Sequence, residues 1–193
     1  MISRIDHVSI AVKDYEKAVH FFKDILGAIP GAAAGDDHLK YFWQIFSLGD
    51  LSRIEILKPT ETGSFLDNFL QDKKEGGVHH ITLQTPDIRK AIMKLEENGI
   101  AHFGLREYGD FWKEIFIHPR DAFGVLIQIA EFHPDDWIHD SLRFRNGEKW
   151  AVHKIEDGCM IDIANPGGGK IRMELSRDEI RKLVSDLDQV QKL

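Results

Sequence analysis

The chain has 193 residues, of which 42% are hydrophobic and 30% are charged, and its formal net charge is −7. Such a length predicts one domain, or a domain with an appendage. The negative balance argues against a nucleic-acid partner, because binding to a phosphate backbone needs a concentrated cationic face. The single cysteine, Cys159, excludes an intrachain disulfide and a paired-cysteine metal site.

The N-terminal stretch "MISRIDHVSI" contains no apolar signal core. No apolar run in the chain approaches the roughly 20 residues that a membrane-spanning helix requires. We therefore expect a cytoplasmic protein that has no membrane partner and acts on a small molecule.

The first predicted elements are a strand, a helix and further strands. Residues 5–12, "IDHVSIAV", are rich in β-branched residues and predict a strand, and apolar residues at helical spacing then predict a helix that ends at Gly27. The runs "LKYFWQIFSL" and "SRIEILKP" predict strands that complete a first module, residues 1–58. A polar, glycine-flanked linker over 59–77 follows.

The same order of elements returns in a second module, residues 78–132. It begins with the strand-like run "VHHITLQT", continues with a helix that ends at Gly99, and closes with the strand-like runs "HFGLRE", "KEIFIHP" and "FGVLIQIAEF". The chain therefore reads as an internal repeat of a strand–helix–strands unit.

A shift of 73 residues superimposes the two modules. It places His7 on His80 (80 − 7 = 73) and Glu55 on Gln128 (128 − 55 = 73). Glu55 and Gln128 are each flanked by isoleucines, which must point toward a helix-covered core because alternate strand side chains face opposite ways. If the modules pack by pseudo-twofold symmetry, the four polar side chains converge on the inner face of a curved sheet.

Two imidazoles, one carboxylate and one amide oxygen form a mixed nitrogen and oxygen ligand set. This set suits one divalent metal ion per chain, whether Zn, Ni, Co, Mn or Fe, and does not choose among them. The predicted fold class is α+β, with two βαβββ modules that form curved mixed sheets around a metal site.

The segments "IDHVSIAVKDYEKAVHFFKDILG", "GGVHHITLQT" and "FIHPRDAFGVLIQI" resemble the vicinal-oxygen-chelate superfamily, which includes glyoxalases, dioxygenases and bleomycin-resistance proteins. The resemblance is closest to the methylmalonyl-CoA epimerase and glyoxalase I branch. It covers about residues 3–132 and implies that the metal positions of the family carry over onto His7, Glu55, His80 and Gln128.

The resemblance also implies a metal-dependent isomerase or lyase that acts through an enolate or enediolate, on a CoA thioester or another oxygen-chelating metabolite, with Glu55 as catalytic base. In the epimerases the position of Gln128 is commonly glutamate, and a looser alignment puts Gln44 at the position of another acidic residue. Gln44 is therefore expected in the pocket, as a substrate contact. Because an amide cannot accept the proton, these two glutamines make two-base epimerisation doubtful.

Two other functions stay open. His7, His80 and Glu55 could form the site of an Fe(II) dioxygenase, which favours two histidines and one carboxylate around open positions. The chain could also be a non-catalytic small-molecule binding protein, although binding members of the superfamily often lack the metal ligands.

Several polar residues have both a functional and a structural interpretation. Gln128 could hydrogen-bond a metal-bound water rather than bind the metal. His118, in "IHPRD", could contact substrate or could be a turn histidine. His79 is expected to be structural, because strand alternation allows only one of His79 and His80 on the inner face. Three cations could hold an anionic substrate or remain solvated surface charges, namely Arg106, Lys113 and Arg120.

Residues 133–193 are expected to form an extension of strands and one helix. The strands are predicted by "KWAVHKIE", "CMIDIA" and "KIRMEL", and the helix by a capping-box pattern that begins at Ser176. The extension is too small to be expected as a second catalytic domain. We expect it to pack against the modules or to form the surface of a homodimer.

Overall fold

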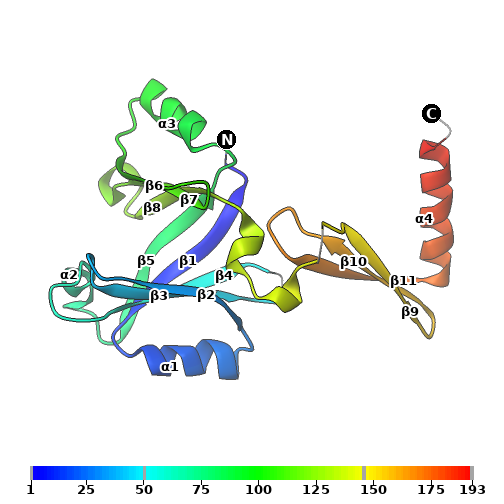
Figure 1. Ribbon diagram of the computed structural model, residues 1–193, viewed down its shortest axis with the longest axis horizontal. Helices are drawn as coiled ribbons and strands as arrows, with labels where there is room; N and C mark the ends of the chain where they lie inside the picture. Colours follow the sequence, from blue (N-terminus) through cyan, green and yellow to red (C-terminus); the bar gives the residue numbers. More distant parts are fainter. Residues whose placement is uncertain (1, 50, 145–146, 192–193) are drawn as a thin grey trace. The chain divides into compact units, whose positions relative to one another are not determined.

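The computed structural model of the chain describes residues 2–49, 51–144 and 147–191. The chain divides into two compact units, Met1–His139 and Asp140–Leu193, drawn in Figure 1 from blue to yellow-green and from yellow to red. Residues 133–139, which the sequence assigned to the extension, thus belong to the first unit.

The first unit contains an eight-stranded mixed sheet with the order β2-β3-β4-β1-β5-β8-β7-β6. The predicted α+β class with two modules is confirmed, since β1 and β5 are antiparallel neighbours at the centre and each lies parallel to the last strand of its own module. The elements of the first module are β1 (Arg4–Val12), α1 (Tyr15–Val19), a π-helical continuation (His20–Ile25), β2 (Ile29–Asp36), β3 (Tyr41–Ser47) and β4 (Arg53–Pro59).

The second module repeats this order after a short linker helix. Its elements are α2 (Asp67–Leu70) in the linker, β5 (Gly76–Gln84), α3 (Ile88–Glu97), β6 (Phe103–Tyr108), β7 (Trp112–Ile117), a 3₁₀ turn (Pro119–Asp121) and β8 (Ile127–Phe132). Ser9 pairs with Glu55 in one module and Thr82 pairs with Gln128 in the other. The 73-residue offset therefore also relates the register of β1 with β4 to that of β5 with β8.

The helices of both modules begin at matched aspartates. The side chain of Asp14 accepts a hydrogen bond from the backbone N–H of Lys17, and that of Asp87 accepts one from Lys90. Figure 1 shows α1 and α3 on the outer sides of the sheet. Isoleucines cover these helix-facing sides, including Ile56 against the α1 region and Ile129 against α3. Glu55 and Gln128, one residue away, must face inward.

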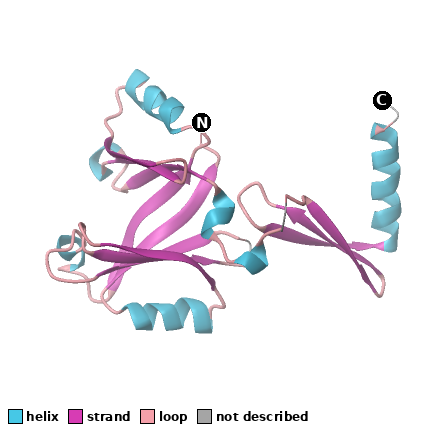
Figure 2. Cartoon of the chain, in the orientation of Figure 1, coloured by secondary structure: helices cyan, strands magenta, loops and turns pink. Residues whose placement is uncertain are grey.

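The second unit is a three-stranded antiparallel sheet with one helix, shown in Figure 2. Its elements are a 3₁₀ turn (Asp140–Leu142), β9 (Trp150–Ile155), β10 (Gly158–Ala164), β11 (Lys170–Ser176) and α4 (Arg177–Val190). Ser176 and Glu179 form the predicted capping box. None of the helices in the described ranges is both long and apolar enough to span a bilayer.

Candidate active site

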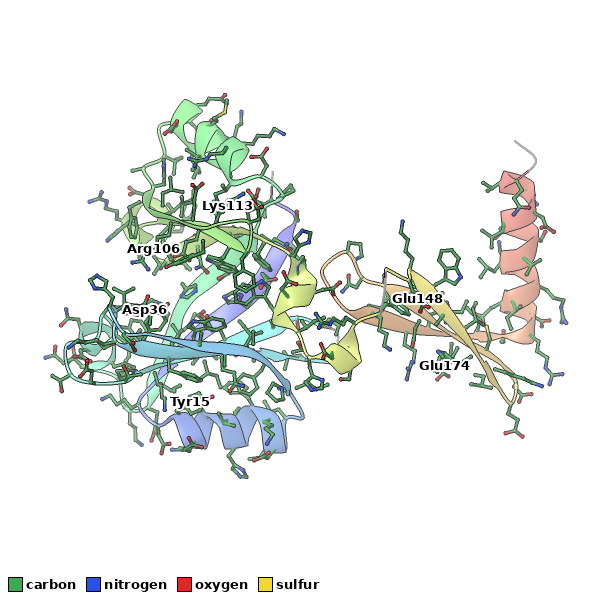
Figure 3. The ribbon with its side chains drawn as sticks, viewed as in Figure 1. Tyr15, Asp36, Arg106, Lys113, Glu148 and Glu174 are labelled. Carbon is green, nitrogen blue, oxygen red and sulfur yellow. The ribbon has the colours of Figure 1, made fainter. Side chains whose placement is uncertain are left out.

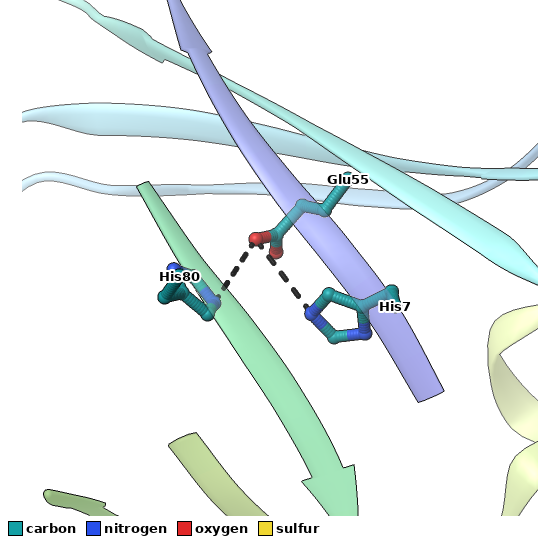
Figure 4. Close-up of side chains that lie close together, drawn as sticks. All are labelled: His7, Glu55 and His80. Carbon is teal, nitrogen blue, oxygen red and sulfur yellow. Dashed lines mark ion pairs between the residues drawn. The ribbon is translucent and has the colours of Figure 1, made fainter. Parts of the chain in front are cut away.

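Three of the four predicted ligands meet on the inner face of the sheet. His7 on β1, Glu55 on β4 and His80 on β5 each offer a ligand atom within 4.8 Å of the others. His7 Nε2 lies 3.8 Å and His80 Nε2 lies 3.6 Å from Glu55 Oε2 (Figure 4). Both imidazoles are buried.

Two hydroxyl groups hold these side chains in place. Ser9 lies between Glu55 and His80 in the strand register, and its Oγ donates to the Glu55 carboxylate and contacts His80 Nε2 at 2.9 Å. Thr82, its counterpart at the 73-residue offset, contacts His7 Nε2 at 2.8 Å. The polar centre is thus built from both modules.

Asp6 fixes the orientation of His7. Its carboxylate lies 2.7 Å from His7 Nδ1 and accepts hydrogen bonds from Arg4 and Arg53. Burial alone would raise the pKa of Asp6, but the hydrogen bond with His7 and the nearby cationic charges outweigh it and lower that pKa. An ionised Asp6 beside Nδ1 fixes the ring of His7 so that Nε2 is the nitrogen that faces Glu55.

The other two residues of the cluster, His80 and Glu55, can both bind a cation. Burial lowers the pKa of His80 well below its usual value, so its imidazole is neutral and can donate a lone pair. Burial raises the pKa of Glu55, and a cation beside it would favour the ionised carboxylate. His7, Glu55 and His80 therefore fit a divalent first-row ion in donor type, burial and charge.

Gln128 lies beside the cluster, with its amide engaged on both sides. Its Oε1 accepts a hydrogen bond from Thr82, and its Nε2 donates to Glu114 Oε2 at 2.6 Å. A ligand role for Gln128 stays a prediction, and it requires the amide oxygen to exchange Thr82 for the ion.

Glu114 on β7 is a functional candidate that the sequence reasoning missed. It is buried, it lines the cavity, and its Oε2 also accepts a hydrogen bond from Trp112 Nε1 at 2.9 Å. The signal was present in the alternation of "KEIFI": Ile115 and Ile117 join the core under α3, so Glu114 must face inward. The second module thus supplies a carboxylate one strand away from Gln128.

Gln44 is not where the sequence placed it. In β3 the cavity is lined by Trp43 and Ile45, and Gln44 points the other way, where its Oε1 accepts a hydrogen bond from the Tyr15 hydroxyl of α1. The expected position in the pocket is corrected, because the register pairs Gln44 with the core residue Ile56 and not with Glu55.

His118 and His79 lie outside the cavity wall. His118 begins the 3₁₀ turn before β8, is exposed, and accepts a hydrogen bond from the backbone N–H of Arg120 at 3.2 Å. His79 packs against Phe65 and Phe69 on the other face of β5. The geometry of both agrees with the structural interpretations.

The cluster opens into a cavity of about 330 Å³, within the size range of small-molecule sites. Aromatic side chains dominate its wall, and acidic residues outnumber basic ones. The lining residues include Asp6, His7, Asp36, Tyr41, Trp43, Glu55, Arg106, Phe111, Trp112, Glu114, Gln128 and Trp137.

The sequence model of the glyoxalase/bleomycin resistance protein/dioxygenase superfamily matches residues 6–116. The chain belongs to this superfamily. It is similar to the mitochondrial methylmalonyl-CoA epimerase of Homo sapiens, with 36% identity over 132 residues that cover 67% of this chain and 74% of the relative. It is equally similar, at 36% over 135 residues, to the ethylmalonyl-CoA/methylmalonyl-CoA epimerase of Cereibacter sphaeroides, covering 68% of this chain and 99% of the relative.

Solved structures agree with this assignment. The crystal structure of methylmalonyl-CoA epimerase from Mycobacterium tuberculosis superimposes with a TM-score of 0.62 at 28% identity, and covers 69% of this chain and 90% of that one. The chain is therefore an epimerase-like enzyme of the superfamily.

Replacement of Asp6 by asparagine should weaken metal binding roughly 10–100-fold, the usual effect of removing the partner that orients a ligating histidine. The change also leaves Arg4 and Arg53 without their shared carboxylate, so the protein should be less stable. Competition with a chelator measures the affinity, and Asp14→Asn, an exposed cap, is the matched control. Unchanged affinity in Asp6→Asn would remove Asp6 from the site.

Acidification should remove the stabilising contribution of neutral His79 from the metal-free protein between pH 6.5 and 4. Burial lowers the pKa of His79 from 6.5 to about 4. Between these pH values the unfolded chain therefore binds a proton at His79 that the folded chain does not bind. This contribution is complete above pH 6.5 and is lost as the pH falls, by up to about 1.4 kcal/mol per pH unit for each such group. His80 contributes in the same direction.

Urea unfolding at several pH values tests this expectation. His79→Phe preserves contact with Phe65 and Phe69 and should flatten the slope by about one proton, whereas the exposed His20→Phe should leave it unchanged. Equal slopes in His79→Phe and the parent would contradict the assignment.

Proposed function

We propose that this chain is a metal-dependent epimerase that moves the proton on the α-carbon of a CoA thioester. The observation that carries the proposal is the pair of carboxylates, Glu55 from the first module and Glu114 from the second, which line one cavity beside two buried histidines. Similarity to epimerases of methylmalonyl-CoA and ethylmalonyl-CoA supports the substrate class.

His7, His80 and Glu55 would hold the divalent ion, with Gln128 as a possible fourth ligand. When bound, such an ion acts as a Lewis acid toward vicinal substrate oxygens and makes the α-proton more acidic. These residues do not select one ion among Zn, Ni, Co, Mn and Fe.

The two carboxylates divide the proton transfers. Glu55 takes or returns the α-proton on its side of the substrate, and Glu114 does so from the other module. Glu114 Oε2 is held by Trp112 and Gln128, which leaves Oε1 for the proton. The doubt about two-base epimerisation rested on Gln44 and Gln128, and it loses its basis because the second carboxylate is Glu114.

We also infer that the chain works in the cytoplasm as a homodimer. A lone, buried Cys159 suits a reducing compartment. The stripe of Val184, Leu187 and Val190 on α4 is exposed and supports an association between copies through the second unit.

The test is the rate of interconversion of single methylmalonyl-CoA and ethylmalonyl-CoA epimers by metal-free and metal-reloaded protein, followed by chiral chromatography. The proposal expects turnover that appears on reloading. An oxygen electrode runs in parallel, and metal-dependent oxygen uptake without interconversion would replace the epimerase by a dioxygenase. Ligand binding without either reaction would show that the chain is a non-catalytic binding protein.

A further inference from the structure

We propose that an aromatic wall closed by Trp137, together with Arg106, forms a recognition site for a carboxylate that bears an apolar substituent larger than methyl. The proposal rests on the proposed function, because it names the acyl group that the same cavity receives. It differs from the established family likeness, because Trp137 lies beyond the matched residues 6–116.

Trp137 reaches the cavity from a short 3₁₀ segment, Pro134–Trp137, which follows β8. The segment is fixed against the sheet at two points. Arg53 Nη1 donates a hydrogen bond to the Pro134 carbonyl at 3.1 Å. Gly31 on β2 lies so close that a β-carbon there would be 2.4 Å from the carbonyl oxygen of Trp137, so only glycine permits this approach.

The ring of Trp137 then joins aromatic side chains from both halves of the sheet. Its centroid lies 5.5 Å from that of Trp43 on β3, 4.8 Å from Phe111 in the turn between β6 and β7, and 4.8 Å from Trp112 on β7. Trp137 itself is buried. All four rings line the cavity, so they form a continuous apolar wall within it.

Such a wall favours a substituent with substantial apolar area. Water leaves both the wall and the substituent when they meet, and the gain grows with the area removed from water. A methyl group covers little of a surface built from three indoles and one phenyl ring. An aromatic or branched substituent covers much more, and stacked or edge-on contacts with the rings add to the gain.

Arg106 supplies the charge that such a ligand would meet. Arg106 is the sole Arg or Lys among the described lining residues of this cavity. It is half-buried, and no carboxylate of the described chain lies within ion-pair distance of it. Figure 3 labels it on β6, across from Asp36 on β2.

Glu114, the carboxylate that the strand register places opposite Arg106, forms its hydrogen bonds with other residues. Glu114 is directly opposite Arg106 in the strand register, yet its carboxylate is bound by Trp112 and Gln128. The guanidinium therefore remains available to a carboxylate of the ligand, which it can bind through two parallel hydrogen bonds.

Unreactive dicarboxylates test the inference without turnover, so its failure and that of the proposed function are distinguishable. Malonate, methylmalonate and benzylmalonate are titrated into the metal-loaded full chain, by calorimetry. Benzylmalonate should bind at least about tenfold more tightly than methylmalonate. Trp137→Ala should reduce that ratio to about threefold or less and leave malonate unchanged. If Trp137→Ala does not fold, Trp137→Phe is measured, and the ratio should fall between these values.

Arg106→Gln should weaken all three ligands about tenfold or more and keep their ratio, since it removes a charge-assisted hydrogen bond and no apolar area. Trp150→Ala on β9 and Arg181→Gln on α4, both exposed, are the matched controls and should change nothing. The proposal is overturned if benzylmalonate binds no more tightly than methylmalonate. It is also overturned if the Trp137 variants keep the parental ratio, or if Arg106→Gln binds malonate as the parent does.

Discussion

Replacement of Glu114 by glutamine should slow the interconversion of substrate epimers about 10²–10⁴-fold, the usual contribution of a positioned acid or base. The shape of the side chain is preserved, and the amide can still meet Trp112 and Gln128. What is lost is the ability to accept or return a proton on one side of the α-carbon. Without a transfer from the Glu114 side, the proton returns through Glu55, so deuterium from D₂O should enter the epimer whose α-proton faces Glu55 and not the other epimer.

The control for Glu114→Gln is Glu107→Gln, the same change at an exposed residue on β6 that pairs with Arg89 at the surface. It should retain the full rate. If Glu114→Gln interconverted the epimers at the parental rate, the second proton transfer would belong to another group, and Glu114 would be a structural residue of the pocket.

Removal of both imidazoles should abolish metal binding. The His7→Gln/His80→Gln protein keeps Glu55 of the described cluster and adds only neutral amide oxygens, and these weak donors do not hold a first-row ion against dialysis. We expect about one Co²⁺ per chain in the parent and almost none in the variant, measured by elemental analysis. The visible spectrum of bound Co²⁺, which reports its ligands, should vanish with it.

The matched control removes two exposed histidines, as His20→Gln/His153→Gln. It should bind Co²⁺ as the parent does. Full metal content in the His7→Gln/His80→Gln protein, with an unchanged spectrum, would show that the metal binds at a different part of the chain. The buried cluster would then be only a polar part of the core.

The internal repeat explains why the fold and the meeting of three predicted ligands could be derived from the sequence. The 73-residue offset compares two copies of one module, and strand alternation then decides which face each side chain takes. His7, Glu55 and His80 lie where both rules place them. The helices α1 and α3 also begin at matched aspartates, Asp14 and Asp87, because an N-cap depends on local sequence.

Glu114 was missed because the repeat offers it no polar counterpart. Its counterpart in the strand registers is Trp43, since Glu114 pairs with Ala130 and Trp43 pairs with Leu57 (130 − 73 = 57), so a comparison of the two copies passes over it. Gln44 failed for a different reason. A shift of one residue in a strand exchanges the two faces, and a loose alignment of β3 cannot fix the position to within one residue.

The place of Trp137 could not be predicted from its neighbours in sequence. A four-residue 3₁₀ segment has too few positions to show a hydrophobic period, so nothing local indicates which side chain enters the cavity. That placement depends on Arg53, Gly31 and the aromatic rings of Trp43 and Trp112, all distant in sequence from Trp137.

The central claim is that two carboxylates exchange the α-proton from opposite sides of the substrate. The most direct measurement incubates one epimer of ethylmalonyl-CoA with metal-loaded protein in D₂O, stops the reaction at low conversion, and determines deuterium in each epimer by chiral separation and mass spectrometry. The account predicts deuterium in the newly formed epimer and little in the remaining starting epimer. Equal deuterium in both epimers would indicate a single base, and no deuterium in either, with one metal bound per chain, would contradict the account.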